Sequence, residues 1–203
     1  AKLKECDAKI EEHLREKSGV DTFEEPKKKE KSNKNNLNFN GKEMLYELTG
    51  TDLAEIFGIT ETNAIEIISE VGLDMSKWPT VKHFTSWLNL APNNKISGGK
   101  VLSSRIPKKK NHAGQIFRMA AFAIQRSKNW LAMFYNRIKA KNGAPKAIVA
   151  TARKIAAIFY KMIKERVKFN PIPIEKYMDG FKENQIKKLK RQAKNLGLQI
   201  VEM

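Results

Sequence analysis

Ser97 is followed directly by Gly98 and Gly99 in the segment 93–100, whose residue types are the best suited to chemistry in this chain. Glycine tolerates backbone conformations that other residues avoid, so the two glycine N–H groups can form an anion-binding concavity. Three basic residues surround the serine and would supply positive charge: Lys95, Lys100 and Arg105. The segment therefore predicts a phosphate site that contains a hydroxyl group.

Two roles are open for the Ser97 hydroxyl. It could attack a phosphodiester as a nucleophile, with the flanking cations stabilising the developing charge, or it could only hydrogen-bond a DNA phosphate. Short Ser-Gly-Gly segments are common in ordinary turns, so the spacing alone favours the phosphate ligand. Other hydroxyls are weaker candidates, because Ser103 and Ser104 have no neighbouring glycine and Tyr135 and Tyr160 fall in apolar helical patterns typical of a core.

We call residues 75–164 the acid-free stretch, because they contain nineteen lysines and arginines and no aspartate or glutamate. The whole chain has 39 basic and 22 acidic residues, which leaves 20 and 22 outside the stretch. A surface without carboxylates attracts polyanions, and counterion release from neutralised phosphates is the usual source of the affinity. The charge distribution therefore predicts nucleic acid as the partner to consider first. A purely structural role would explain this charge segregation poorly.

Further candidate phosphate contacts lie in the same stretch: Lys108, Lys109, Lys110, His112, Arg118, Arg153 and Lys154. His112 could touch a phosphate or could cap a helix. Arg153 and Lys154 fall in a helical pattern after Gly143, and the spacing of the apolar residues there predicts that both basic side chains are exposed.

The sequence does not support metal or disulfide chemistry within this chain. Cys6 is the only cysteine, and we expect it to be a small buried residue on a helix face. His13 and His83 have no partners at metal-ligand spacing. Nucleases that use two metal ions need several carboxylates, and the acid-free stretch has none. Any metal-dependent cleavage would therefore have to come from another domain or chain.

Apolar residues recur at helical spacing along most of the chain, and few segments alternate with the period of two that a sheet requires. We therefore expect an all-α fold, with a compact helical domain as its main part. The expected organisation is a coiled-coil helix end at 1–18, a flexible linker at 19–41, the helical domain at 42–169 with a basic loop at 93–110, and a C-terminal basic helix at 170–203.

Residues 44–72 predict a helix-hairpin-helix, in which one helix leads into a glycine turn at Gly58 and a second helix follows it. Thr60 or Thr62 would cap the second helix, whose N-terminal N–H groups could bind a DNA phosphate. A packing corner without any DNA contact explains the same spacing equally well. Gly72 is expected to end the second helix.

The chain has no run of about eighteen uncharged apolar residues, and its start lacks the apolar stretch of a signal peptide. We therefore expect a cytoplasmic protein without membrane association. The sequence opens partway through a helical pattern and not at a cap, so we expect a fragment of a longer protein.

The run 78–105, WPTVKHFTSWLNLAPNNKISGGKVLSSR, closely resembles the C-terminal transposase domain of the insertion-sequence 110/116/902 family. The resemblance extends to further segments along nearly the whole chain: 57–72, 111–113, 118–121, 143–147, 150–154 and the helix at the start.

The resemblance implies a DNA recombinase of a prokaryotic, nucleoid-associated kind, guided by a structured bridge RNA. Its catalytic serine would be Ser97, which would form a covalent phosphoserine link to cleaved DNA. The family's N-terminal RuvC-like domain, whose carboxylates bind metal and imply Mg²⁺, would work beside this part. The seam of Leu3, Cys6, Ile10 and Leu14 would then pair subunits into dimers or tetramers.

Two departures from the family are visible in the sequence. The RuvC-like domain is not among these 203 residues, so this chain alone is expected to bind DNA but not to recombine it. The turn before Glu61 also lacks the second glycine typical of such hairpins, and this carboxylate would repel a phosphate. A non-catalytic nucleic-acid-binding module derived from such a transposase therefore stays open as the alternative.

Overall fold

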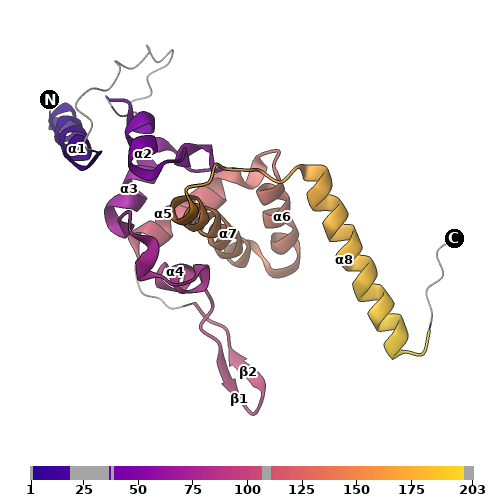
Figure 1. Cartoon of the computed structure of the whole chain (residues 1–203). Coiled ribbons are helices and arrows are strands. Elements are labelled where there is room, and N and C mark those ends of the chain that lie inside the picture. The colour runs from indigo at the N-terminus through magenta and orange to yellow at the C-terminus, as the bar shows by residue number, and fades with distance from the viewer. Residues whose placement is uncertain (1, 19–36, 38, 107–110, 199–203) are drawn as a thin grey trace.

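The computed structural model describes residues 2–18, 37, 39–106 and 111–198, and within these ranges the fold is almost entirely helical (Figure 1). The all-α prediction is confirmed. The elements are α1 Lys2–Ser18, α2 Gly41–Thr49, η1 Leu53–Glu55, α3 Glu61–Val71, η2 Met75–Lys77, α4 Val81–Trp87, β1 Lys95–Ser97, β2 Lys100–Ser103, α5 His112–Ala123, η3 Ile124–Arg126, α6 Trp130–Asn142, α7 Ala144–Glu165 and α8 Ile174–Asn195, where η marks a 3-10 helix.

Helix α7 lies at the centre of the helical body and packs against α4, α5 and α6. Its buried side chains recur every three to four residues, so one face is apolar along the length of the helix. Phe159 is fully buried there, and its ring meets that of Phe117 edge-on at 5.4 Å between centroids. Burial of one such side chain contributes about 1.5–3 kcal/mol. This core holds the elements on either side of Ser97 in place.

The predicted helix-hairpin-helix differs from expectation in its first arm. Helix α2 ends at Thr49 and is followed by Gly50, whose left-handed φ of 71° stops the helix. Helix α3 begins after Thr60, whose hydroxyl accepts a hydrogen bond from the Asn63 N–H at 3.2 Å, so the cap is confirmed. Helix α3 ends before Gly72, also as expected.

Gly58 at this turn packs closely against the end of α5. A Cβ atom at this position would lie 2.7 Å from the Ala120 carbonyl oxygen and 2.8 Å from Cγ2 of Ile124. Its φ of 85° is also unfavourable for other residues. The turn therefore has the geometry of a packing corner.

The segment expected to be an irregular basic loop contains a β-hairpin, which corrects the sequence prediction. Strands β1 and β2 are antiparallel and are joined by Gly98 and Gly99, with φ of 53° and 73°. Two positive φ angles are typical of the type I′ turn that joins two-residue hairpins. Strands of three and four residues are too short for alternation to be recognised in sequence. Figure 1 shows the hairpin projecting from the helical body.

Helix α1 forms where expected, but most of its apolar seam is exposed. Leu14 packs in a small cluster with Phe39 and Met44. Leu3 is 77% exposed and Cys6 is exposed as well, so the expected burial of the cysteine is wrong. The greater part of the expected linker lies outside the described residues, and its last position, 41, is the first residue of α2.

Helix α8 is the predicted C-terminal basic helix, and no residue of it is buried. Figure 1 shows it extending away from the helical body. Its first turns contact α6 through the rings of Tyr177 and Phe181. Among the residues that the structure describes, no helix is long and apolar enough to cross a membrane.

Candidate nucleic-acid site

The β-hairpin places Ser97 beside Lys100. Ser97 pairs with Lys100 across the strands, directly before the turn, so the two side chains share one face. Lys95 lies two residues earlier on β1, but the register of the strands shifts between Lys95 and Ile96, so the pairing does not fix its side chain beside Ser97. Ile96 pairs with Val101 on the opposite face. The hairpin thus places one of the three predicted cations, Lys100, beside the hydroxyl and keeps a second, Lys95, on the same strand.

The two glycines are needed for the turn and leave its tip open. A Cβ atom at Gly98 or Gly99 would meet no other atom within 4 Å, so neither glycine is there to make room for this chain's own residues. Their positive φ angles explain why the turn requires glycine. The backbone of the tip is consequently accessible to a ligand, as the predicted anion-binding concavity requires.

The hairpin is exposed on both of its faces. Ile96 is 63% exposed and Leu102 is 70% exposed. A single two-stranded hairpin is marginally stable in water, and exposed apolar side chains on such an element are typical of a binding surface. No described residue hydrogen-bonds the Ser97 hydroxyl, so a proton acceptor for this serine is not provided by the described part of the chain.

Backbone contacts hold the base of the hairpin. The Asn93 N–H donates to the Arg105 carbonyl oxygen at 3.1 Å, and the Arg105 N–H donates to the Ser103 hydroxyl at 3.4 Å. The exposed side chain of Arg105 is therefore at the foot of the β-hairpin, away from the turn. The basic run 108–110, predicted to contact phosphate, lies outside the described residues.

Arg118 on α5 stabilises the segment that leads into the hairpin. Its Nη2 donates to the carbonyl oxygen of Asn89 at 2.8 Å, and burial lowers the pKa of this guanidinium. Asn89 has a φ of 55°, an uncommon value for a residue other than glycine. Arg118 was predicted as a phosphate contact, and the structure gives its guanidinium a structural partner.

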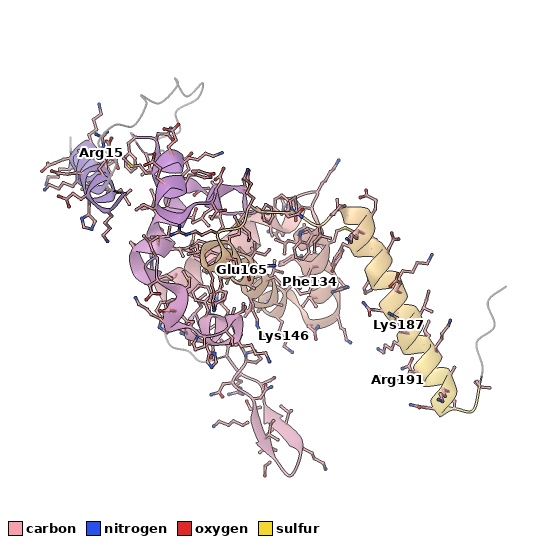
Figure 2. All side chains as sticks on the ribbon, in the orientation of Figure 1. Arg15, Phe134, Lys146, Glu165, Lys187 and Arg191 are labelled. Atoms are coloured by element: carbon pink, nitrogen blue, oxygen red, sulfur yellow. The ribbon has the colours of Figure 1, made fainter. Side chains whose placement is uncertain are left out.

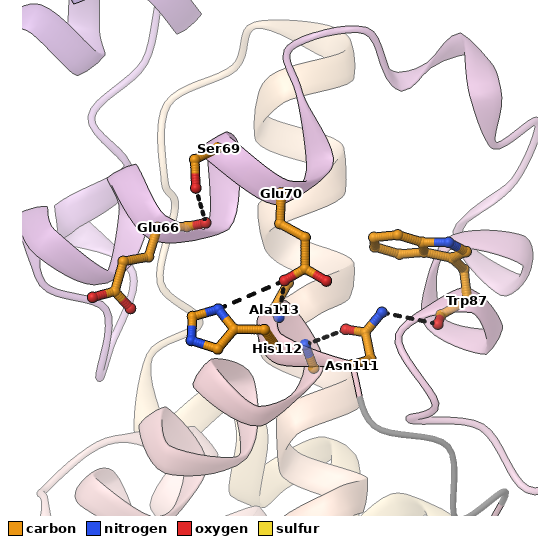
Figure 3. Close-up of polar contacts among 8 residues, drawn as sticks. Glu66, Ser69, Glu70, Trp87, Asn111, His112 and Ala113 are labelled. Atoms are coloured by element: carbon orange, nitrogen blue, oxygen red, sulfur yellow. Dashed lines mark hydrogen bonds and ion pairs between the residues drawn. The ribbon is translucent and has the colours of Figure 1, made fainter. Parts of the chain in front are cut away.

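Asn111 fixes the other end of the segment (Figure 3). Its side-chain oxygen caps α5 by accepting from the Gly114 N–H at 2.6 Å, and its amide nitrogen donates to the Trp87 carbonyl oxygen at 3.4 Å. The predicted cap at His112 is therefore wrong by one residue. An asparagine directly before a helical pattern is an N-cap signal that the sequence already contained.

A carboxylate from outside the acid-free stretch lies at the N-terminus of α5. Glu70 on α3 accepts a hydrogen bond from the Ala113 N–H, and its Oε2 lies 3.7 Å from Nδ1 of His112 (Figure 3). An anion is favourable at a helix N-terminus. This end of α5 therefore already has a negative partner, and a phosphate contact by His112 would have to compete with Glu70.

Lys154 does not lie on an exposed face, which corrects the sequence prediction. Its Nζ is 4.8 Å from the ring centre of Phe134 and 5.6 Å from that of Trp130, as in cation–π contacts. Burial, and then the charge of Arg137, lower the pKa of this lysine. Arg153 is half-buried. Both residues belong to the body, from which the β-hairpin projects, and the structure does not bring them to Ser97.

The two tyrosines considered as nucleophiles are buried, as the sequence indicated. The Tyr160 hydroxyl donates to the Trp78 carbonyl oxygen at 2.7 Å and accepts from Nζ of Lys164 at 2.7 Å. Within the described ranges, no three His, Cys, Asp or Glu side chains come together as a metal site.

A family model covers the part of the chain that contains this site. Residues 50–136 match the transposase IS116/IS110/IS902 family. The transposase match begins at Gly50, after α2, and ends at Asn136, within α6, so it includes Ser97 and the whole β-hairpin. It confirms the family resemblance for this region and favours a transposase or recombinase function. No curated protein matches the chain.

Proposed function

We propose that this chain is the DNA-binding part of a transposase and that Ser97 is its strand-transfer nucleophile. The observation that carries the proposal is the position of Ser97, directly before an open Gly-Gly turn and paired across the strands with Lys100, with Lys95 on the same strand. This face is exposed and free of carboxylates. A phosphodiester can therefore approach the hydroxyl without electrostatic repulsion.

The proposed step forms a bond from the Ser97 oxygen to phosphorus and breaks the bond from phosphorus to one sugar oxygen. The hydroxyl proton passes to a base, and the released sugar oxygen takes up a proton. Lys95 and Lys100 would stabilise the negative charge on the phosphoryl oxygens, which is what preorganised cations contribute to such transition states. The phosphoserine link preserves the energy of the broken bond for rejoining.

The rest of the machinery is assigned to other domains or molecules. The described residues do not form a carboxylate cluster that fits Mg²⁺, so we assign metal and base to a RuvC-like domain. A guide RNA would select the DNA. The exposed seam of α1, with Leu3 and Ile10, would pair with another subunit. All of these partners are part of the proposal.

A suicide-substrate trap tests the nucleophile. The intact transposase, with its RNA, is incubated with a nicked DNA whose cleavage releases a short fragment and prevents religation. We expect a covalent protein–DNA adduct with the wild type and none with Ser97→Ala. Ser104→Ala is the matched control, since it removes an exposed hydroxyl seven residues away, and it should form the adduct normally. An adduct that survives Ser97→Ala would refute the assignment.

The second candidate is a nucleic-acid-binding module without catalysis. It is favoured by one observation, that no described side chain hydrogen-bonds Ser97 to activate it. In that case the intact protein binds DNA, but no adduct forms with the wild type or with either serine variant. Ser97→Ala then changes the affinity for DNA only slightly. The same trap therefore separates the two candidates.

A further inference from the structure

The first turns of helix α8 are attached to the helical body by aromatic and cation–π contacts. The ring of Tyr177 lies 5.8 Å from that of Trp130, between centroids. The Arg137 guanidinium on α6 lies 4.6 Å from the ring centre of Phe181 and 5.6 Å from that of Tyr177. Cation–π contacts of this kind hold a helix in a defined place, so α8 has a fixed starting point on α6.

Beyond these contacts, α8 is strongly basic. Between Gly180 and Leu198 the chain has six lysines and arginines and one acidic residue, Glu183. Three of the basic residues, Lys187, Arg191 and Lys194, are spaced by four and then three positions, so they line one face of the helix. We call these three the basic stripe. All are exposed, and Figure 2 shows Lys187 and Arg191 on the extending part of α8.

We propose that the basic stripe of α8 binds a nucleic-acid backbone, as a second contact separate from the β-hairpin. The choice of nucleic acid as the bound polyanion rests on the proposed function. The stripe rises by about 10 Å from Lys187 to Lys194, at 1.5 Å per residue. This spans about three nucleotides of a strand at 3.4 Å each. The contact is to phosphates and does not read sequence.

The composition of the apolar side of α8 favours nucleic acid over a lipid surface. Ile186, Leu189 and, just past the helix end, Leu196 lie on the side of α8 away from the stripe, and a basic helix with an apolar face can also bind membranes. Helices that lie in a lipid interface usually carry Trp or Phe on the apolar face. After Phe181, α8 has no aromatic residue. The helix also follows a region that matches a transposase family.

Two double variants of the whole chain test the proposal. Lys187→Gln with Lys194→Gln removes two charges from the stripe, and Lys182→Gln with Lys188→Gln removes two from other faces of the same helix. Binding to a fluorescent DNA duplex is measured by anisotropy at several salt concentrations, and helicity by circular dichroism. Each neutralised phosphate contributes about 0.9 to the steepness of log K against log salt concentration. The stripe variant, which loses two charges, should therefore show a slope shallower by about 1.8.

We expect the stripe variant to bind about five- to tenfold more weakly at moderate salt, with helicity unchanged, and the control variant to keep the wild-type slope. Equal losses in the two variants would mean that only total charge matters, and would overturn the proposal. So would an unchanged affinity of the stripe variant, or no duplex binding by the wild type. If the stripe variant lost binding to anionic lipid vesicles but kept its DNA affinity, the stripe would be assigned to membranes instead.

This experiment is independent of the chemistry at Ser97. Equilibrium binding does not require a covalent adduct, and Ser97→Ala should leave the effect of the stripe variant unchanged. If the serine trap fails while the stripe variant binds weakly, the catalytic proposal is wrong and the α8 proposal stands. If the trap succeeds and the stripe has no effect, the reverse holds.

Discussion

Tyr160 shows how a residue with possible chemistry becomes part of the core. Its position in an apolar helical pattern indicated burial, and the structure confirms it at 3% exposure. The hydroxyl donates to the Trp78 carbonyl oxygen, which connects α7 to the residues before α4. A buried carbonyl of this kind needs a donor, because losing one costs the desolvation of the unpaired group.

Tyr160→Phe should therefore lower the free energy of unfolding by about 1–3 kcal/mol, because the Trp78 carbonyl loses its donor. The measurement is urea denaturation followed by fluorescence. Tyr46→Phe is the matched control, since Tyr46 is 47% exposed, and it should leave the stability unchanged. Equal stability of both variants would show that water replaces the Tyr160 hydroxyl.

At the scale of elements, the contact between α5 and the end of α4 positions the segment that bears Ser97. Gly114 on α5 is buried against this end, and a Cβ atom there would lie 2.2 Å from the Leu88 carbonyl oxygen. The glycine is thus required by close approach of two elements. Its φ is not positive, so turn chemistry alone does not explain it.

Gly114→Ala should force α5 and α4 apart and destabilise the protein by about 1–3 kcal/mol, the usual cost of overpacking. Gly180→Ala on α8 is the matched control, because no atom lies within 4 Å of its Cβ position. There alanine should stabilise the helix by up to about 1 kcal/mol. Thermal unfolding measures both, and a neutral Gly114→Ala would contradict the close packing.

At the scale of the whole molecule, the acid-free stretch is not entirely free of carboxylates in space. Glu70, which precedes the stretch, lies at the N-terminus of α5, and Glu165, which follows it, lies 3.7 Å from Lys161. The β-hairpin has no such partner among the described residues, and it projects from the body. The hairpin is therefore the part of the stretch where positive charge is least compensated.

Lys95→Gln with Lys100→Gln should reduce the salt dependence of DNA binding by about 1.8 in the log–log slope, if each lysine neutralises one phosphate. Lys4→Gln with Lys17→Gln on α1 removes the same charge outside the acid-free stretch and should change the slope little. Anisotropy titrations over several salt concentrations provide both values. A larger effect of the α1 variant would place the interface elsewhere.

Several features were predictable from sequence because they depend on near neighbours. The helical pattern, the Thr60 cap, the helix end at Gly72 and the charge segregation all follow from residue types within a few positions. The short β-hairpin was missed because three residues of β1 cannot show a period of two convincingly. The Gly-Gly pair is its strongest signal in sequence, because two glycines suit a type I′ turn as well as a ligand-binding loop.

The sequence by itself determined the helical class and the charge segregation, since composition and local spacing carry these, and its family resemblance singled out Ser97 as the residue to test. Only the tertiary structure decided which cations accompany the serine. Lys100 faces Ser97 across the strands, whereas Lys154 lies over the rings of Phe134 and Trp130. The physical reason is that strand pairing and core packing join residues through contacts that periodicity along one segment does not encode.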